Sequence, residues 1–140
     1  MNSKNFLIAG KNMLKNTLAS FGLYCLMLAG TQGISELFSS KINNQNLEQI
    51  LKIEKRRVGL NEDRIIYVRI SKNEDETSAA QKLNENKYQI VLSPNPSLNT
   101  LRHELYHISD GHCDKPYNLL KYLFIQEPQA TIYSITGLKP

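Results

Sequence analysis

The residues with the clearest chemistry lie in one short stretch, residues 103–107, with the sequence HELYH. Histidines four positions apart occupy one face of a helix about one turn apart, so His103 and His107 can reach a single metal ion. Zinc suits this pair because neutral imidazole nitrogens bind it at about 2.0–2.1 Å. Glu104 stands beside the first histidine and is placed instead to hold and deprotonate a water molecule. The pattern therefore predicts a zinc site with its own base.

A catalytic zinc site needs a third protein ligand, and the sequence offers several candidates. Glu127 follows His107 by twenty residues, which leaves room for a connection and a returning helix at 117–126. His112 is the second choice, because a helix continued to residue 112 would point it about 140° away from His107. Only a sharp turn at Gly111 would bring that ring back. The remaining candidates are Asp110, Cys113 and Asp114.

The order of the motifs carries a resemblance to known enzymes. HELYH, then Glu127-Pro-Gln-Ala at 127–130, then Gly137 and Pro140 resembles the gluzincin metallopeptidases. The ExxA element is similar to that of the CAAX-protease-like and ImmA/IrrE-like families. This resemblance implies that His103, His107 and Glu127 bind zinc and that Glu104 is the catalytic base. It also implies a zincin-like fold, in which a strand leads into the active-site helix.

A zinc peptidase also needs a donor for the oxyanion that forms on the scissile carbonyl. Tyr133, six residues after Glu127, is the expected donor, with Tyr106, Tyr117 and His112 as rivals. The resemblance further implies that the strand at 88–92 is a sheet edge that a peptide substrate extends. Cys113 is expected to be a small residue near the site and no nucleophile, since no cysteine-protease context surrounds it.

The elements that must position these residues fit in one domain of the 140-residue chain. Apolar spacing predicts a helix over 44–57 and strands over 64–70 and 88–93, with an acidic loop over 72–78. Residues 79–87 are expected to form a weak helix or a loop. Helices are predicted from Leu98, capped by Ser97 or Asn99, over 117–126, and over 128–135 up to Gly137. The predicted fold is α+β, a minimal zincin-like domain over 34–140 with a small antiparallel or mixed sheet.

The N-terminal segment, residues 1–33, has a different character. Residues 18–30 contain no charge and follow three lysines, which is typical of a signal peptide or an N-terminal membrane anchor. We therefore expect membrane association through residues 17–34 and a secreted or membrane-anchored protein, the alternative being a buried helix of the domain. Three of the 17 basic residues and none of the 13 acidic ones lie in this segment, so the rest has a net charge of +1. That balance argues against a nucleic-acid partner.

Two functions stay open at this point. The expected one is a zinc-dependent peptidase that hydrolyses peptide bonds of a peptide or protein substrate. The alternative is a non-catalytic zincin-like domain that binds a metal or a partner; a zinc hydrolase acting on another bond is a third. Glu104 favours catalysis, because metal binding alone does not need that acid. The two cysteines, Cys25 and Cys113, are not expected to form a disulfide.

Overall fold

The computed structural model describes residues 20, 22–24, 26–27, 30–31, 33–116 and 118–140. The chain divides into two units, Met1–Ile34 and Ser35–Pro140. In the first unit the described residues between 20 and 34 are helical, and most of the predicted leader, including Cys25, lies outside the described residues. Within the part of the chain that is described, no helix has the length and apolar character needed to cross a bilayer.

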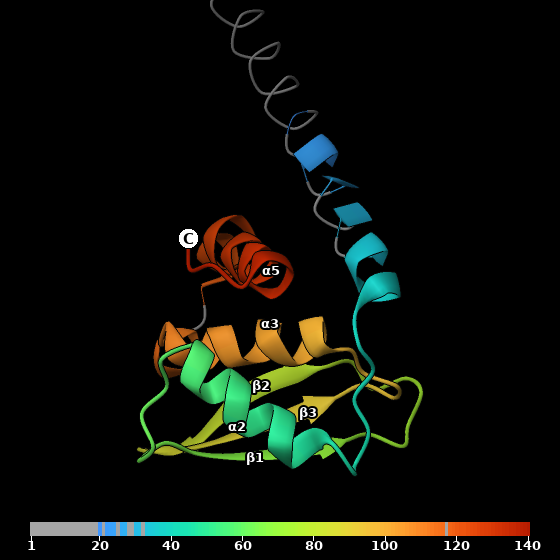
Figure 1. The fold of residues 1–140 in the computed structure, drawn as a ribbon. Helices are drawn as coiled ribbons and strands as arrows, with labels where there is room; N and C mark the ends of the chain where they lie inside the picture. Colours follow the sequence, from blue (N-terminus) through green and yellow to red (C-terminus); the bar gives the residue numbers. More distant parts are fainter. Residues whose placement is uncertain (1–19, 21, 25, 28–29, 32, 117) are drawn as a thin grey trace, which may run out of the picture. The chain divides into compact units, whose positions relative to one another are not determined.

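The second unit is a three-stranded sheet with helices packed on one face (Figure 1). Strand order is β1-β3-β2, with β1 parallel and β2 antiparallel to the central strand β3. The predicted α+β class is confirmed. The elements in chain order are α2 (Leu47–Arg57), β1 (Ile65–Ile70), β2 (Ala79–Asn84), β3 (Lys87–Leu92), α3 (Leu98–Ser109), η1 (His112–Asp114), α4 (Leu119–Lys121), the π-helix η2 (Tyr122–Gln126) and α5 (Glu127–Thr136).

The two strands predicted from β-branched and aromatic residues are confirmed as β1 and β3, in a register that sets Ile66 opposite Tyr88 and Val68 opposite Ile90. In β3 every second residue is buried, which is the period of a strand with one face on a core. The expectation that residues 88–92 form an exposed edge is wrong, because β3 is paired on both sides. The edge strand next to α3 is β2.

The weak helix or loop predicted at 79–87 is also wrong. Ala79–Asn84 forms strand β2, which pairs with β3 and is joined to it by a two-residue turn at Glu85 and Asn86. This strand is mostly exposed and lacks β-branched residues. Its conformation therefore comes from the hydrogen-bonded ladder with β3, a tertiary effect that local propensity does not reveal.

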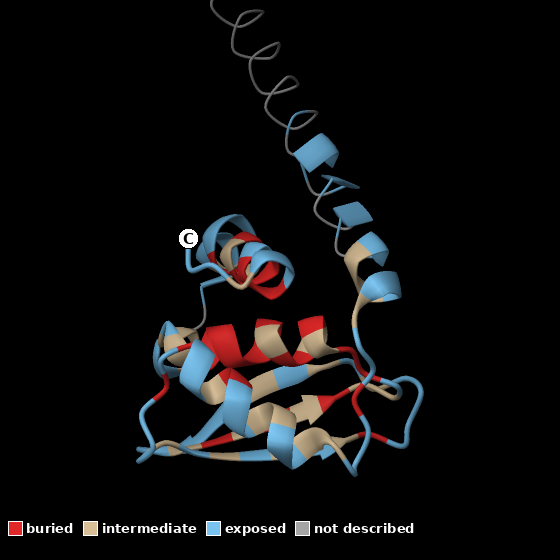
Figure 2. Cartoon of the chain, viewed as in Figure 1, coloured by how far each residue is buried: buried red, intermediate tan, exposed pale blue. Residues whose placement is uncertain are grey.

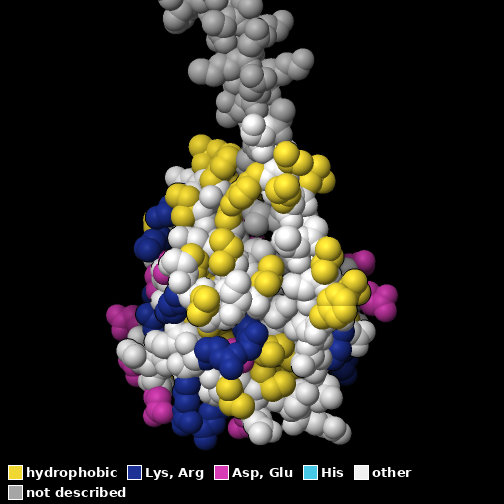
Figure 3. Space-filling model, turned by 45° about the horizontal axis from the view of Figure 1, so that its top comes forward, with side chains coloured by type: hydrophobic (Ala, Val, Ile, Leu, Met, Phe, Trp, Pro, Cys, Tyr) yellow, Lys and Arg dark blue, Asp and Glu magenta, His cyan; other side chains and the backbone are white. Residues whose placement is uncertain are grey.

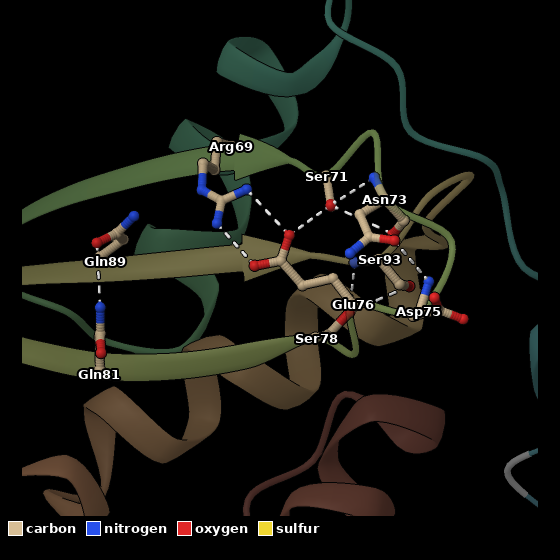
Figure 4. Close-up of polar contacts among 9 residues, drawn as sticks. All are labelled: Arg69, Ser71, Asn73, Asp75, Glu76, Ser78, Gln81, Gln89 and Ser93. Atoms are coloured by element: carbon tan, nitrogen blue, oxygen red, sulfur yellow. Dashed lines mark hydrogen bonds and ion pairs between the residues drawn. The ribbon is translucent and has the colours of Figure 1, made fainter.

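The predicted acidic loop after β1 is confirmed, and one of its acids, Glu76, is paired with Arg69 of β1 (Figure 4). The Arg69 guanidinium donates to both carboxylate oxygens of Glu76, at 3.2 and 2.7 Å. Ser71 donates to the same carboxylate, and the backbone N–H of Asn73 donates to Ser71. The hydrogen bond from Arg69 lowers the pKa of Glu76. Glu76 thus has a structural role in this loop.

Helix α3 is the element around which the unit is built. Its predicted cap is confirmed: Ser97 accepts the backbone N–H of Thr100 at 3.1 Å. The buried residues of α3 and β3 form the centre of the core (Figure 2). Buried Glu54 of α2 accepts two hydrogen bonds from Arg102 of α3, at 3.0 and 3.1 Å. This ion pair fixes α2 against α3. The core residues of α3 and β3 are Leu101, Leu105, Tyr106, Ile108, Tyr88, Ile90 and Leu92.

The C-terminal helices differ from the prediction in one respect. A break was expected between the helices at 117–126 and 128–135, but the chain runs as one helical segment from Leu119 to Thr136. Pro128 has no N–H to donate, and a π turn precedes it, in which the N–H of Glu127 bonds to the carbonyl of Tyr122. The π turn accommodates the proline, so the helix continues through it. Gly137, in the left-handed conformation, ends it as predicted.

Candidate metal centre

Three side chains from two helices converge on one point. His103 and His107 come from α3, and Glu127 is the first residue of α5. The Nε2 atoms of the two histidines are 3.1 Å apart. The Glu127 carboxylate lies 3.4 Å from Nε2 of His103 and 3.1 Å from Nε2 of His107. These three residues form a cluster that can hold a metal ion.

The spacing of the ligand atoms fits a small tetrahedral ion. Bonds of about 2.0–2.1 Å in tetrahedral geometry place neighbouring ligand atoms about 3.3–3.4 Å apart. The two Nε2 atoms, 3.1 Å apart, are close to this spacing, and each carboxylate oxygen of Glu127 faces one histidine: Oε1 lies 3.1 Å from His107 and Oε2 lies 3.4 Å from His103. One ligand atom from each of the three residues can be chosen so that all lie within 4.8 Å of one another. Two imidazoles and one carboxylate are also a donor set that zinc takes in catalytic sites. The residues present therefore fit zinc.

The protonation of the cluster follows from its burial and charge. Burial alone would raise the pKa of Glu127, but hydrogen bonds from His103, His107 and Tyr122 outweigh it and hold the pKa far below its ordinary value. Burial alone would lower the pKa of His103, but its hydrogen bond to Glu127 and the charge of Glu104 raise it. A metal ion that binds here must displace the protons that these hydrogen bonds use.

Tyr122 is a site residue that the sequence did not reveal. Its ring stacks on His107, with centroids 6.1 Å apart and planes at 18°, and its side chain hydrogen-bonds Glu127. Residues five apart lie about 140° apart on an α-helix, so nothing in the spacing of Tyr122 and Glu127 suggests contact. The π turn between them removes that difference. The signal that could have indicated it is Pro128 within an apolar helical run.

Asp110 and His112 form a second layer behind His107. Gly111 takes a left-handed conformation with φ of 69°, which supplies the turn needed to bring His112 back. Nδ1 of His112 lies 2.9 Å from Nδ1 of His107, and Nε2 of His112 lies 2.8 Å from the Asp110 carboxylate. His112 therefore meets the nitrogen of His107 that faces away from the cluster, and the structure does not bring it among the three converging side chains.

One arrangement of protons satisfies this second layer once a metal ion has displaced the proton between His107 and Glu127. Nδ1–H of His107 donates to Nδ1 of His112, and Nε2–H of His112 donates to Asp110. Burial and the neighbouring His107 lower the pKa of His112, which keeps its ring neutral as this arrangement requires. The lone pair on Nε2 of His107 is then directed at the cluster. The ring of His103 is not oriented in this way, because its buried Nδ1 has no hydrogen-bond partner among the described residues.

The second layer leads to a prediction. Replacing His112 with alanine is expected to weaken zinc binding by about 10- to 100-fold, the usual cost of losing the group that orients a ligating histidine. Competition with a chromophoric chelator measures the affinity. Asp114→Ala is the matched control, because Asp114 is in the same short helix but pairs with Lys82 and Tyr88. Equal affinities for the wild type and His112→Ala would contradict the assigned role.

Glu104 is buried next to the cluster. The backbone N–H of Ala80, in the edge strand β2, donates to its carboxylate. Burial raises the pKa of Glu104, against the opposing effect of His103 and His107. Cys113 contacts the carbonyl of the same Ala80 at 3.7 Å, and burial raises the pKa of its free thiol to about 11. At neutral pH Cys113 is thus a protonated thiol, not a nucleophile.

Of the tyrosines considered as oxyanion donors, Tyr106 and Tyr133 are buried. Tyr133 is buried and stacks on Tyr106 with centroids 5.3 Å apart, in the contact between α5 and α3. Burial, with the charge of Glu54, raises the pKa of Tyr133, and its buried hydroxyl has no hydrogen-bond partner among the described residues. The charged groups that affect this hydroxyl are those of the α2–α3 ion pair, and none is a member of the cluster. Tyr117 lies outside the described residues.

The fold and the cluster define a small α+β unit with a His-His-Glu site on its central helix. Comparison with known proteins adds no family to this description. No protein-family model, no curated protein and no solved structure matches the chain.

Proposed function

We propose that this protein is a zinc-dependent peptidase of the gluzincin type. The observation that carries the proposal is the convergence of His103, His107 and Glu127, whose ligand atoms all lie within 4.8 Å of one another, with Glu104 on the adjoining helical position. Three protein ligands leave the fourth tetrahedral position open, which is characteristic of catalytic rather than structural zinc sites.

Zinc bound at this site would lower the pKa of a water molecule toward about 7 and polarise the carbonyl of the substrate. The protein supplies the proton transfers. Glu104 takes a proton from the attacking water and delivers it to the leaving amine. Its buried position, which raises its pKa, suits a group that must both accept and release a proton near neutral pH. Tyr122 and the His112–Asp110 pair hold Glu127 and His107 in place.

The edge strand β2 supports a peptide as the substrate. It is unpaired on the side away from β3 and meets Glu104 at Ala80. An extended peptide that adds to this edge through main-chain hydrogen bonds passes next to the base. The thiol of Cys113 makes only a long contact with the Ala80 carbonyl, at 3.7 Å, and a peptide N–H can replace it.

The test uses the purified full-length chain. It is expected to contain about one zinc per chain by elemental analysis and to cleave members of a fluorogenic peptide library. A chelator should abolish the cleavage, and added zinc should restore it. A chain that binds zinc at this site but cleaves no peptide would favour the alternative, a metal- or partner-binding domain. A chain that binds no zinc would refute the peptidase and leave only a domain that binds a partner.

A further inference from the structure

The outer side of the C-terminal helical segment carries large apolar side chains that are largely exposed. On α5, Ala130, Tyr133 and Ser134 are buried against the domain, whereas Ile132 and Ile135 are not. We name the following set the apolar face; its side chains are 38% to 87% exposed: Phe38, Leu120, Phe124, Ile132, Ile135 and Leu138.

Residues from opposite ends of the second unit share this face. Phe38, shortly after the start of the unit, and Ile135 of α5 line one pocket together with Leu98 of α3. Leu120 and Phe124 are four residues apart in the same helical segment as Ile132 and Ile135. Hydrophobic side chains are spread in several groups over this side of the molecule, with both basic and acidic side chains at its margins (Figure 3). Exposed large apolar side chains gathered on one side often mark a surface that binds a partner or a membrane.

The charges around the face favour an anionic partner. Between Leu119 and Lys139 the only acidic side chain is Glu127, which is engaged by the two histidines of the cluster. Lys121 and Lys139 lie in or next to the same helical segment. Within the segment itself, apolar side chains stand between two lysines and the one carboxylate is engaged, which is a composition found in helices that lie in the headgroup region of a bilayer.

The apolar run that precedes the unit favours a membrane as the partner of the apolar face. Residues 18–30 form an uncharged apolar run, preceded by three lysines and no acid. Phe38 follows that run by eight residues, so a segment held in a membrane would raise the local concentration of lipid around the apolar face.

We propose that the apolar face of the 35–140 unit rests on the surface of a lipid bilayer that contains anionic lipids, with α4, η2 and α5 lying in its interface. This contact is a second attachment, separate from the N-terminal segment. It is independent of the metal and of the proposed peptidase activity.

The chain contains no tryptophan, so a single introduced tryptophan reports on one position. Phe124→Trp and Leu120→Trp place it in the apolar face, and Tyr67→Trp places it on the exposed side of β1. Each full-length variant is mixed with vesicles of phosphatidylcholine and phosphatidylglycerol, with and without a brominated lipid. We expect the emission at positions 120 and 124 to shift to shorter wavelength and to be quenched by bromine, and the emission at position 67 to stay unchanged.

Every other outcome counts against the proposal. If the protein sediments with the vesicles while tryptophan at positions 120 and 124 stays in water, the N-terminal segment alone makes the contact. If the emission shifts without lipid and grows with protein concentration, a second copy covers the face. If the response is equal in vesicles of phosphatidylcholine alone, the charge argument from Lys121 and Lys139 is wrong. Circular dichroism of each variant verifies that it is folded.

Discussion

Replacing Glu104 with glutamine is expected to abolish peptide hydrolysis while leaving zinc bound. Glutamine has the same shape and can still accept the N–H of Ala80, so the fold around β2 is preserved. It cannot take a proton from water, and the loss of general base catalysis typically costs about 10²- to 10⁴-fold in rate. The measurements are kcat/KM on a cleaved fluorogenic peptide and the zinc content of the purified variant.

Glu48→Gln, in the exposed first turn of α2, serves as the matched control for this prediction. It removes one carboxylate from the chain at a distance from the cluster and should leave both measurements at their wild-type values. Full activity of Glu104→Gln would remove Glu104 from the mechanism. Loss of zinc from this variant would instead show that Glu104 helps to hold the metal.

Replacing Glu127 with alanine is expected to weaken zinc binding more severely than any change in the second layer. The substitution removes one of three ligands and leaves two buried histidines without the carboxylate that they share. Losing a group behind a ligand costs about 10- to 100-fold in affinity, and losing a ligand itself should exceed that range. The affinity is measured by the same chelator competition as for His112→Ala.

The comparison with His112→Ala decides which residue is the third ligand. If His112→Ala loses more affinity than Glu127→Ala, the ligand is His112 and the observed convergence is an ion pair without a metal. Glu74→Ala, in the exposed acidic loop, controls for the loss of a carboxylate elsewhere in the chain and should bind zinc like the wild type.

Local patterns predicted those parts of the fold in which periodicity and burial coincide. Helix α3 and strands β1 and β3 have strongly apolar faces, and the Ser97 cap marks where α3 begins. Strand β2 was not predicted, because its residues favour no particular secondary structure. Their conformation is determined by pairing with the neighbouring strand β3. The order of the strands, and with it the edge, is likewise a property of the tertiary fold.

The same distinction applies to the site. The i, i+4 spacing predicted that His103 and His107 share one face, and Glu127 was placed by its distance along the chain and by resemblance. The partners of these residues were not predictable in the same way. The contact of Tyr122 depends on a π turn, and the place of His112 depends on the left-handed conformation of Gly111. Both are backbone departures that no side-chain pattern encodes.

The π turn restricts how the length of this helical segment can change. It amounts to one additional residue inserted in an otherwise α-helical run, and it changes the helical phase of everything beyond it by about 100°. Glu127 and Tyr122 share a side of the segment only because of that insertion. A version of the chain shortened by one residue here would keep almost the same composition, yet it would need a different side chain to steady the carboxylate.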